Sequence, residues 1–122
     1  MKFLKFWLPL IIWSGLIFYA SSMPADTPIL RWLDILSSYA GHFFEFMVLA
    51  LLSFRAFNNS FPKWGVRNVF YAGSFSILFA VSDEIHQAFV PTRFCSGSDI
   101  LVDVLGVGFA FFLLRLRHRR YT

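Results

Sequence analysis

The chain has 122 residues, of which 57% are hydrophobic, 20% are aromatic and only 15% are charged. A soluble domain carries roughly 25% charged residues, so this composition indicates a protein that exposes much of its surface to lipid. The length allows a single domain over residues 1–122. One cysteine excludes an internal disulfide and a cysteine-based metal cluster.

Four apolar segments predict an all-α membrane protein with four transmembrane helices, since each has about the ~20 residues that cross a bilayer. We expect these helices at about residues 6–23, 39–57, 68–90 and 99–116. The first segment is similar to a secretory signal peptide, but its bulky aromatic residues favour a retained helix. Between the helices we expect an external loop at 25–38, with an amphipathic piece at 29–36, and a turn at 58–65.

The basic residues predict which way the helices run. If the N-terminus is cytoplasmic, only Arg31 and Arg93 of the eleven lysines and arginines fall on the outer side. This excess of inner positive charge predicts that both termini are cytoplasmic. The basic tail then anchors the last helix to anionic lipid head groups, so the net charge of +4 does not indicate a nucleic-acid partner. The inner basic residues are Lys2, Lys5, Arg55, Lys63, Arg67, Arg115, Arg117, Arg119 and Arg120.

All seven carboxylates fall on, or toward, the outer side of this topology. Positive-inside sorting does not explain this, because acidic residues contribute little to it. At a rise of 1.5 Å per residue, Glu45, Asp83 and Asp103 lie roughly 6–10 Å inside the outer ends of their helices. Three helices should therefore bring a carboxylate to one shallow layer near the outer surface.

The helical spacing of small and polar residues predicts that these carboxylates point at one another. His42 and Glu45 share one face of the second helix, and stripes of small and polar residues mark one face of the third and fourth. Small residues allow helices to approach closely in lipid, so the stripes should face the bundle. The stripes consist of Gly73, Ser76, Ala80, Asp83 and Gln87, and of Asp99, Asp103, Gly106 and Ala110.

Two interpretations of the polar layer involve no metal. In a structural interpretation, hydrogen bonds and ion pairs with Arg93 hold the bundle together. In an active site, His86 paired with Asp83, or His42 with Glu45, would transfer protons while Arg93 binds an anionic group. The candidate catalytic residues are His42, Glu45, Asp83, Glu84, His86, Gln87, Asp99 and Asp103.

A divalent metal site and an ion or proton relay are the two further interpretations. Carboxylates with histidine suit a divalent cation, and the candidate ligands are Glu45, Asp83, His86 and Asp103, although no spacing names the metal. A relay is disfavoured because the inner half of the spans has no acidic residue to carry a proton onward. Charged groups at membrane depth are costly and usually functional, which favours a functional site over structure alone.

The polar residues belong to four blocks of sequence: FYASSMP at 18–24, GHFFEF at 41–46, DEIHQAFVPTR at 83–93 and SDILVD at 98–103, followed by Gly106. In order and spacing, these blocks resemble the VanZ-like family of small bacterial membrane proteins. The resemblance covers nearly the whole chain. Its most specific part is the Asp-Glu-x-x-Gln sequence followed by Arg and Asp.

This resemblance implies a multi-pass protein of the bacterial inner membrane with a connection to the cell envelope. The name-giving member of the family is associated with resistance to the glycopeptide antibiotic teicoplanin, but the resemblance implies no particular reaction. Two residues depart from the family pattern, in which Asn is frequent at the position of Asp103 and Gly at that of Thr92. The additional carboxylate favours cation binding or a proton shared with Asp99.

Together these observations predict an outward-facing polar site that acts on a cell-envelope lipid or a lipid-linked precursor. In that role His86 or His42 would move protons, and membrane lipids would be the partners. The alternative is a non-enzymatic protein that binds or shields against a lipophilic antibiotic, or that assists assembly. The sequence does not decide whether the protein is an enzyme.

Overall fold

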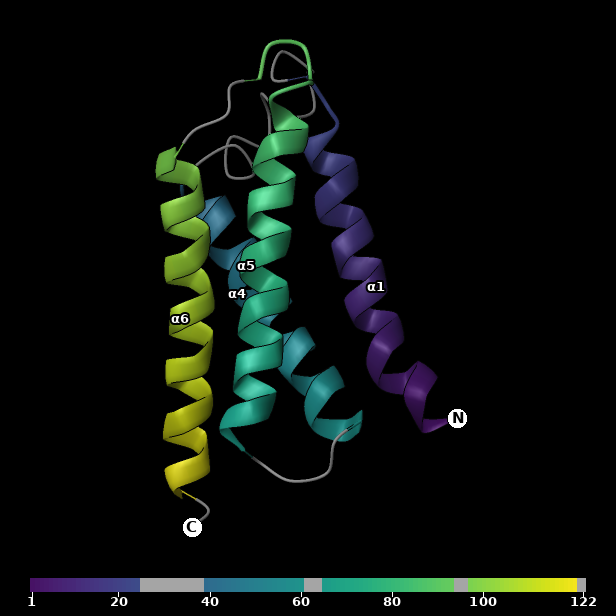
Figure 1. The fold of residues 1–122 in the computed structure, drawn as a ribbon, viewed down its shortest axis with the longest axis vertical. Helices are drawn as coiled ribbons and strands as arrows, with labels where there is room; N and C mark the ends of the chain where they lie inside the picture. The colour runs from purple at the N-terminus through teal and green to yellow at the C-terminus, as the bar shows by residue number, and fades with distance from the viewer. Residues whose placement is uncertain (25–38, 61–64, 94–96, 121–122) are drawn as a thin grey trace.

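A computed structural model describes residues 1–24, 39–60, 65–93 and 97–120. In these ranges the chain forms four helices: α1 (Lys2–Ser21), α4 (Tyr39–Ser60), α5 (Val66–Gln87) and α6 (Gly97–Arg120) (Figure 1). The prediction of an all-α fold with four helices is therefore confirmed. The expected external loop at 25–38, with its amphipathic piece at 29–36, lies outside the described residues.

Prolines and helix-forming residues account for where the helices end. α1 ends at Ser21 and α5 at Gln87, before the expected ends at 23 and 90. Residues 23 and 90 each precede a proline, which disfavours the helical conformation there. α4 continues through Ser60, so residues 58–60 are helical rather than part of the expected turn. α6 runs on to Arg120, beyond the expected end at 116, since arginine is a good helix former.

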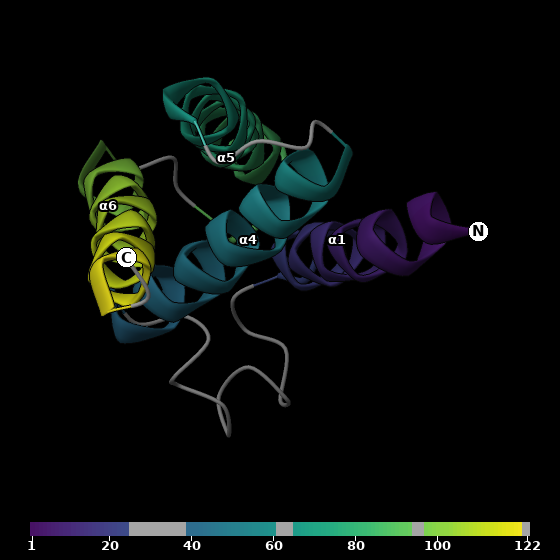
Figure 2. The same ribbon diagram turned by 90° about the horizontal axis from the view of Figure 1, so that it is seen from below.

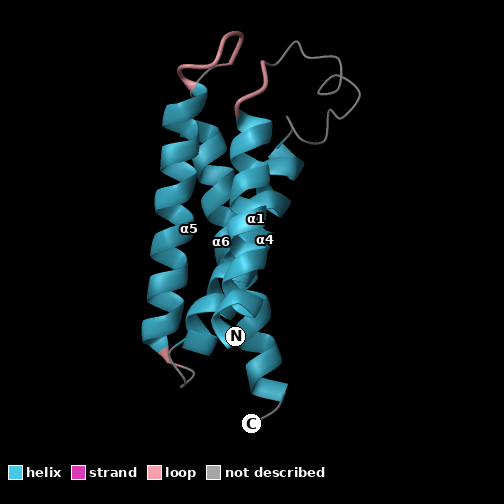
Figure 3. Cartoon of the chain, turned by 90° about the vertical axis from the view of Figure 1, so that its right-hand side faces the viewer, coloured by secondary structure: helices cyan, strands magenta, loops and turns pink. Residues whose placement is uncertain are grey.

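α4 lies at the centre of the bundle and contacts the other three helices (Figure 2). α5 also contacts α1 and α6, whereas α1 and α6 do not contact each other in the described part of the chain. α1 and α5 end, and α4 and α6 begin, at one end of the bundle, which we call the polar end (Figure 1). Both chain termini lie at the opposite end, which we call the basic end because Lys2, Lys5, Arg115 and Arg120 lie there (Figure 3).

The distribution of polar residues on α5 is the reverse of that on a soluble helix. Its buried residues are mostly small or polar, whereas Phe70 and Leu78 are 67% and 69% exposed. α6 shows the same reversal, with Asp103 buried and Leu105 exposed. Apolar surface of this extent fits contact with lipid, in which small and polar residues hold helices together. The buried residues of α5 are Asn68, Ala72, Ser76, Ala80, Asp83, Glu84 and Gln87.

Among the described helices, α1 and α4 are long and apolar enough to cross a membrane by length and composition. The same test does not select α5 and α6. α5 contains buried polar residues such as Asp83 and Glu84, and α6 ends in exposed basic residues from Arg115 to Arg120. The prediction of four membrane-spanning helices is thus supported for two of them on this criterion.

α4 and α6 approach each other closely at Gly106. A Cβ atom at this position would clash with the carbonyl oxygen of Phe43 and would lie 3.2 Å from the backbone nitrogen of Met47. Both of these atoms belong to the backbone of α4, so rotation of a side chain cannot relieve the clash. The glycine therefore sets the distance between α6 and the first turns of α4.

Replacing Gly106 with alanine should destabilise the protein. Overpacking lowers the free energy of unfolding by about 1–3 kcal/mol. This exceeds the ~1 kcal/mol by which alanine, as a better helix former than glycine, would raise it. Gly108→Ala is the matched control, because a Cβ at Gly108 meets open space and should leave stability unchanged or raised. Circular dichroism during thermal unfolding in detergent measures both variants, and equal midpoints would contradict the close approach.

Candidate functional site

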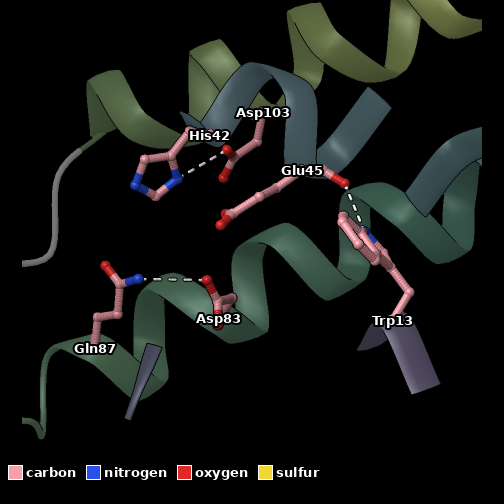
Figure 4. Close-up of polar contacts among 6 residues, drawn as sticks. All are labelled: Trp13, His42, Glu45, Asp83, Gln87 and Asp103. Atoms are coloured by element: carbon pink, nitrogen blue, oxygen red, sulfur yellow. Dashed lines mark hydrogen bonds and ion pairs between the residues drawn. The ribbon is translucent and has the colours of Figure 1, made fainter. Parts of the chain in front are cut away.

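His42 and Asp103 join α4 to α6 at the polar end (Figure 4). The Nδ1 atom of His42 lies 3.1 Å from Oδ1 of Asp103, and both side chains are buried. A carboxylate at this distance fixes the imidazole ring and favours the proton on Nδ1. The Nε2 atom of His42 is then the nitrogen that can accept a proton from a bound molecule.

A pocket opens beside this pair, between α1, α4 and α5. Its empty space is about 260 Å³, including the space at its open mouth. Only about 10 Å³ of this space is enclosed, which is roughly what one water molecule needs, so a ligand group has to bind at the open mouth. The lining residues are Ile17, Ala20, Ser21, His42, Glu45, Asp83, Gln87 and Arg93.

Two carboxylates form the polar wall of the pocket. Asp83 accepts a hydrogen bond on Oδ2 from Nε2 of Gln87 at 3.4 Å. The Glu45 carboxylate points into the space between Asp83 and the His42–Asp103 pair (Figure 4). The Glu45 backbone carbonyl accepts a hydrogen bond of 3.0 Å from Trp13, which ties α1 to α4 beneath the pocket.

Arg93 closes the pocket from the segment that follows α5. Its Nε donates to the carbonyl of Met23 at 3.0 Å and its Nη2 to the carbonyl of Ala20 at 3.3 Å. Because a guanidinium has five N–H groups, several remain for an anion in the pocket. In the described part of the chain Arg93 forms no ion pair with a carboxylate, so the ion pairs of the structural interpretation are not seen there.

Thr92, the residue before Arg93, has an unusual backbone conformation. Its φ of 65° lies in the left-handed region, which glycine adopts freely and which costs other residues roughly 1–2 kcal/mol. The resemblance described above has glycine as the frequent residue at this position. The structure thus gives a physical reason for that preference.

His86 faces away from the pocket. Its Nε2 lies 2.9 Å from the Ser22 hydroxyl oxygen, and its ring stacks on Phe18 at 4.3 Å between centroids. The expected His86–Asp83 and His42–Glu45 pairs are therefore not the ones that form, since Asp83 contacts Gln87 and His42 contacts Asp103. His86 lies on a different face of α5 from Asp83, and that face is turned toward α1.

Glu84 and Asp99 complete the set of expected site residues. Glu84 is fully buried, and one ligand atom each from Glu84, His42 and Asp103 lies within 4.8 Å of the others. This group shares only Asp103 with the expected metal ligands, because Glu45, Asp83 and His86 are not part of it. Asp99 lies half-buried in the first turn of α6 and does not line the pocket.

The sequence did contain a signal for the position of Glu84. Ala72, Ser76, Ala80 and Glu84 follow one another at intervals of four residues, and all are buried. A row of this spacing stays on one face of a helix, so the small residues mark the face that Glu84 continues.

Comparison with known proteins identifies a family. The family model described as VanZ/LLP1 matches residues 6–118, which include every expected site residue. Comparisons with curated proteins and with solved structures gave no match.

Asp103→Asn should leave the fold nearly as stable as before, because asparagine keeps an oxygen that accepts the His42 hydrogen bond. Asp103→Leu should lower the free energy of unfolding by about 1–3 kcal/mol, since it leaves the buried N–H group of His42 without an acceptor. Urea unfolding in detergent, followed by circular dichroism, measures the difference. Equal stability of the two variants would show that the His42–Asp103 contact is not formed.

Proposed function

The chain belongs to the VanZ/LLP1 family, and from this premise we propose that it is a multi-pass protein of the bacterial inner membrane that acts on the head group of an envelope lipid or a lipid-linked precursor. The pocket at the polar end carries this proposal. There Arg93, His42 and two carboxylates line the open mouth of one small pocket, in a bundle whose outer surface is apolar.

In the proposed topology all four helices cross the membrane and both termini are cytoplasmic. The apolar outer faces of α5 and α6 support four spans, and the basic end that carries both termini matches the inner excess of positive charge (Figure 3). The pocket then opens toward the outer leaflet, where lipid-linked envelope precursors are used.

Reporter fusions test this topology. A fluorescent protein, which folds only in the cytoplasm, should be bright when fused after Asn59 and after Arg120. Alkaline phosphatase, which is active only outside, should be active when fused after Pro24. An active phosphatase at the C-terminus would place the two chain ends on opposite sides and overturn the proposed topology.

The pocket suits recognition of a negatively charged head group and transfer of a proton. Arg93 binds the anionic group with the N–H groups that the α1 carbonyls leave available. His42, oriented by Asp103, accepts a proton on Nε2 from a hydroxyl of the head group and donates it back in a later step. Glu45 and Asp83 accept hydrogen bonds from hydroxyl or amino groups of the head group.

A non-enzymatic role in binding or assembly is the second candidate. Several polar residues link helices to one another, as they would in a protein whose polar layer holds the bundle together: Trp13 contacts α4 and Ser22 contacts His86. Shielding that encloses a whole glycopeptide antibiotic is disfavoured by the small volume of the pocket. An effect on teicoplanin susceptibility would instead follow from an altered envelope precursor.

Profiling of envelope lipids and precursors in cells with and without the protein tests the proposed function. Expression of the protein should change one phosphorylated or glycosylated lipid selectively. Arg93→Gln should reduce this change by roughly 10- to 100-fold, because hydrogen bonds to a charged group contribute about 1.5–3 kcal/mol. The matched control is Arg67→Gln, an exposed arginine at the start of α5, which should act like the wild type.

Equal amounts of each variant in the membrane, measured by immunoblot, are needed for this comparison. If no lipid changes but a lipid co-purifies with the wild type and not with Arg93→Gln, the binding role is supported. If the profile is unchanged and no lipid co-purifies selectively, the pocket is not a lipid site.

A further inference from the structure

We propose that His42, Glu84 and Asp103 together bind one divalent transition-metal ion. The three side chains come from α4, α5 and α6, and all three are buried. One ligand atom from each lies within 4.8 Å of the others. This inference rests on the proposed function and refines it: His42 lines the pocket, and with the ion bound it would hold the metal at the pocket wall instead of accepting the substrate's proton.

One buried carboxylate oxygen of Asp103 is available to bind a metal ion. Oδ1 contacts His42, but Oδ2 has no hydrogen-bond partner in the described part of the chain, although the side chain is 0% exposed. A buried polar atom without a partner costs about 1–3 kcal/mol, and more when it is charged. A cation between the three side chains would satisfy this oxygen.

Several carboxyl groups lie close together around the proposed metal site, and their negative charge has to be balanced. Glu84 and Asp103 are both carboxyl groups, and Glu45 and Asp83 from α4 and α5 add two more at the pocket wall. Arg93 is the cation among the pocket-lining residues, but it donates to backbone carbonyls of α1. Burial of several carboxylates requires protons or a metal ion to balance their charge.

The donor atoms favour an ion such as Zn²⁺ or Mn²⁺. Imidazole nitrogen with carboxylate oxygen suits these ions. Ligand atoms about 2.0–2.2 Å from one ion lie roughly 3–3.5 Å apart, so the three side chains, whose ligand atoms lie within 4.8 Å of one another, would have to draw together slightly around the ion. Three protein ligands leave a coordination position open, as in catalytic rather than structural zinc sites.

The test uses the full-length chain purified in detergent and incubated separately with Zn²⁺ and with Mn²⁺. After removal of free metal, mass spectrometry should find stoichiometric metal in the wild type with at least one of the two ions. Glu84→Gln and Asp103→Asn should both lose it. Glu45→Gln and Asp99→Asn are matched controls, because they neutralise carboxylates close to the group that are not proposed ligands, and both should retain the metal.

A spectroscopic measurement tests the proposed nitrogen ligand directly. Protein loaded with Co²⁺ should show nitrogen coupling from an imidazole ligand in pulsed electron paramagnetic resonance. His86→Ala should keep this signal, since His86 contacts α1, whereas His42→Ala should remove it. Zn²⁺ or Mn²⁺ should also raise the thermal midpoint of the wild type and leave that of Asp103→Asn unchanged.

Metal in the wild type no greater than in a detergent blank, or equal metal in Asp103→Asn and Asp99→Asn, would overturn the metal site. Loss of the nitrogen signal in His86→Ala but not in His42→Ala would do the same. Arg93→Gln separates the two proposals, because it should abolish the lipid change and still bind the metal. A metal-free protein that changes envelope lipids would contradict only the metal site.

Discussion

The close approach of α4 and α6 at Gly106 is the constraint on which the polar end of this protein depends. Lipid tails compete for apolar contacts as well as another helix does, so small residues decide how near two helices come. With no Cβ at Gly106, the first turns of α4 lie near enough for His42 to reach Asp103. Glu84 meets this pair from α5, and the pocket opens beside it.

The sequence was sufficient for the all-α fold and for the faces of the helices, because apolar length and helical periodicity determine both. It was not sufficient for the pairing of side chains. Periodicity assigns a residue to a face but does not say which helix lies opposite, so His86 was expected beside Asp83 and instead contacts Ser22 and Phe18. Glu84 was included among the site residues, but its approach to His42 required the packing of three helices.

The reversed polarity of α5 and α6 connects the fold to the proposed site. An average over a whole helix cannot distinguish a polar buried face from a polar exposed one, and lipid contacts only the exposed face. A helix can therefore present apolar residues such as Leu78 to lipid while it carries Asp83 inward. The same arrangement gathers carboxylates where water is scarce, which is why their charge must be balanced by protons, by a bound cation or by the ligand itself.

At the edge of the pocket, Arg93 joins the turn after α5 to the end of α1. Thr92 adopts its φ of 65° at a cost of roughly 1–2 kcal/mol, and the hydrogen bonds of the next residue, Arg93, to Met23 and Ala20 help to offset this cost. The same guanidinium lines the pocket, so its position there depends on the position of the end of α1. The first helix therefore does more than pack against α4: its last turn fixes the orientation of the arginine that lines the pocket.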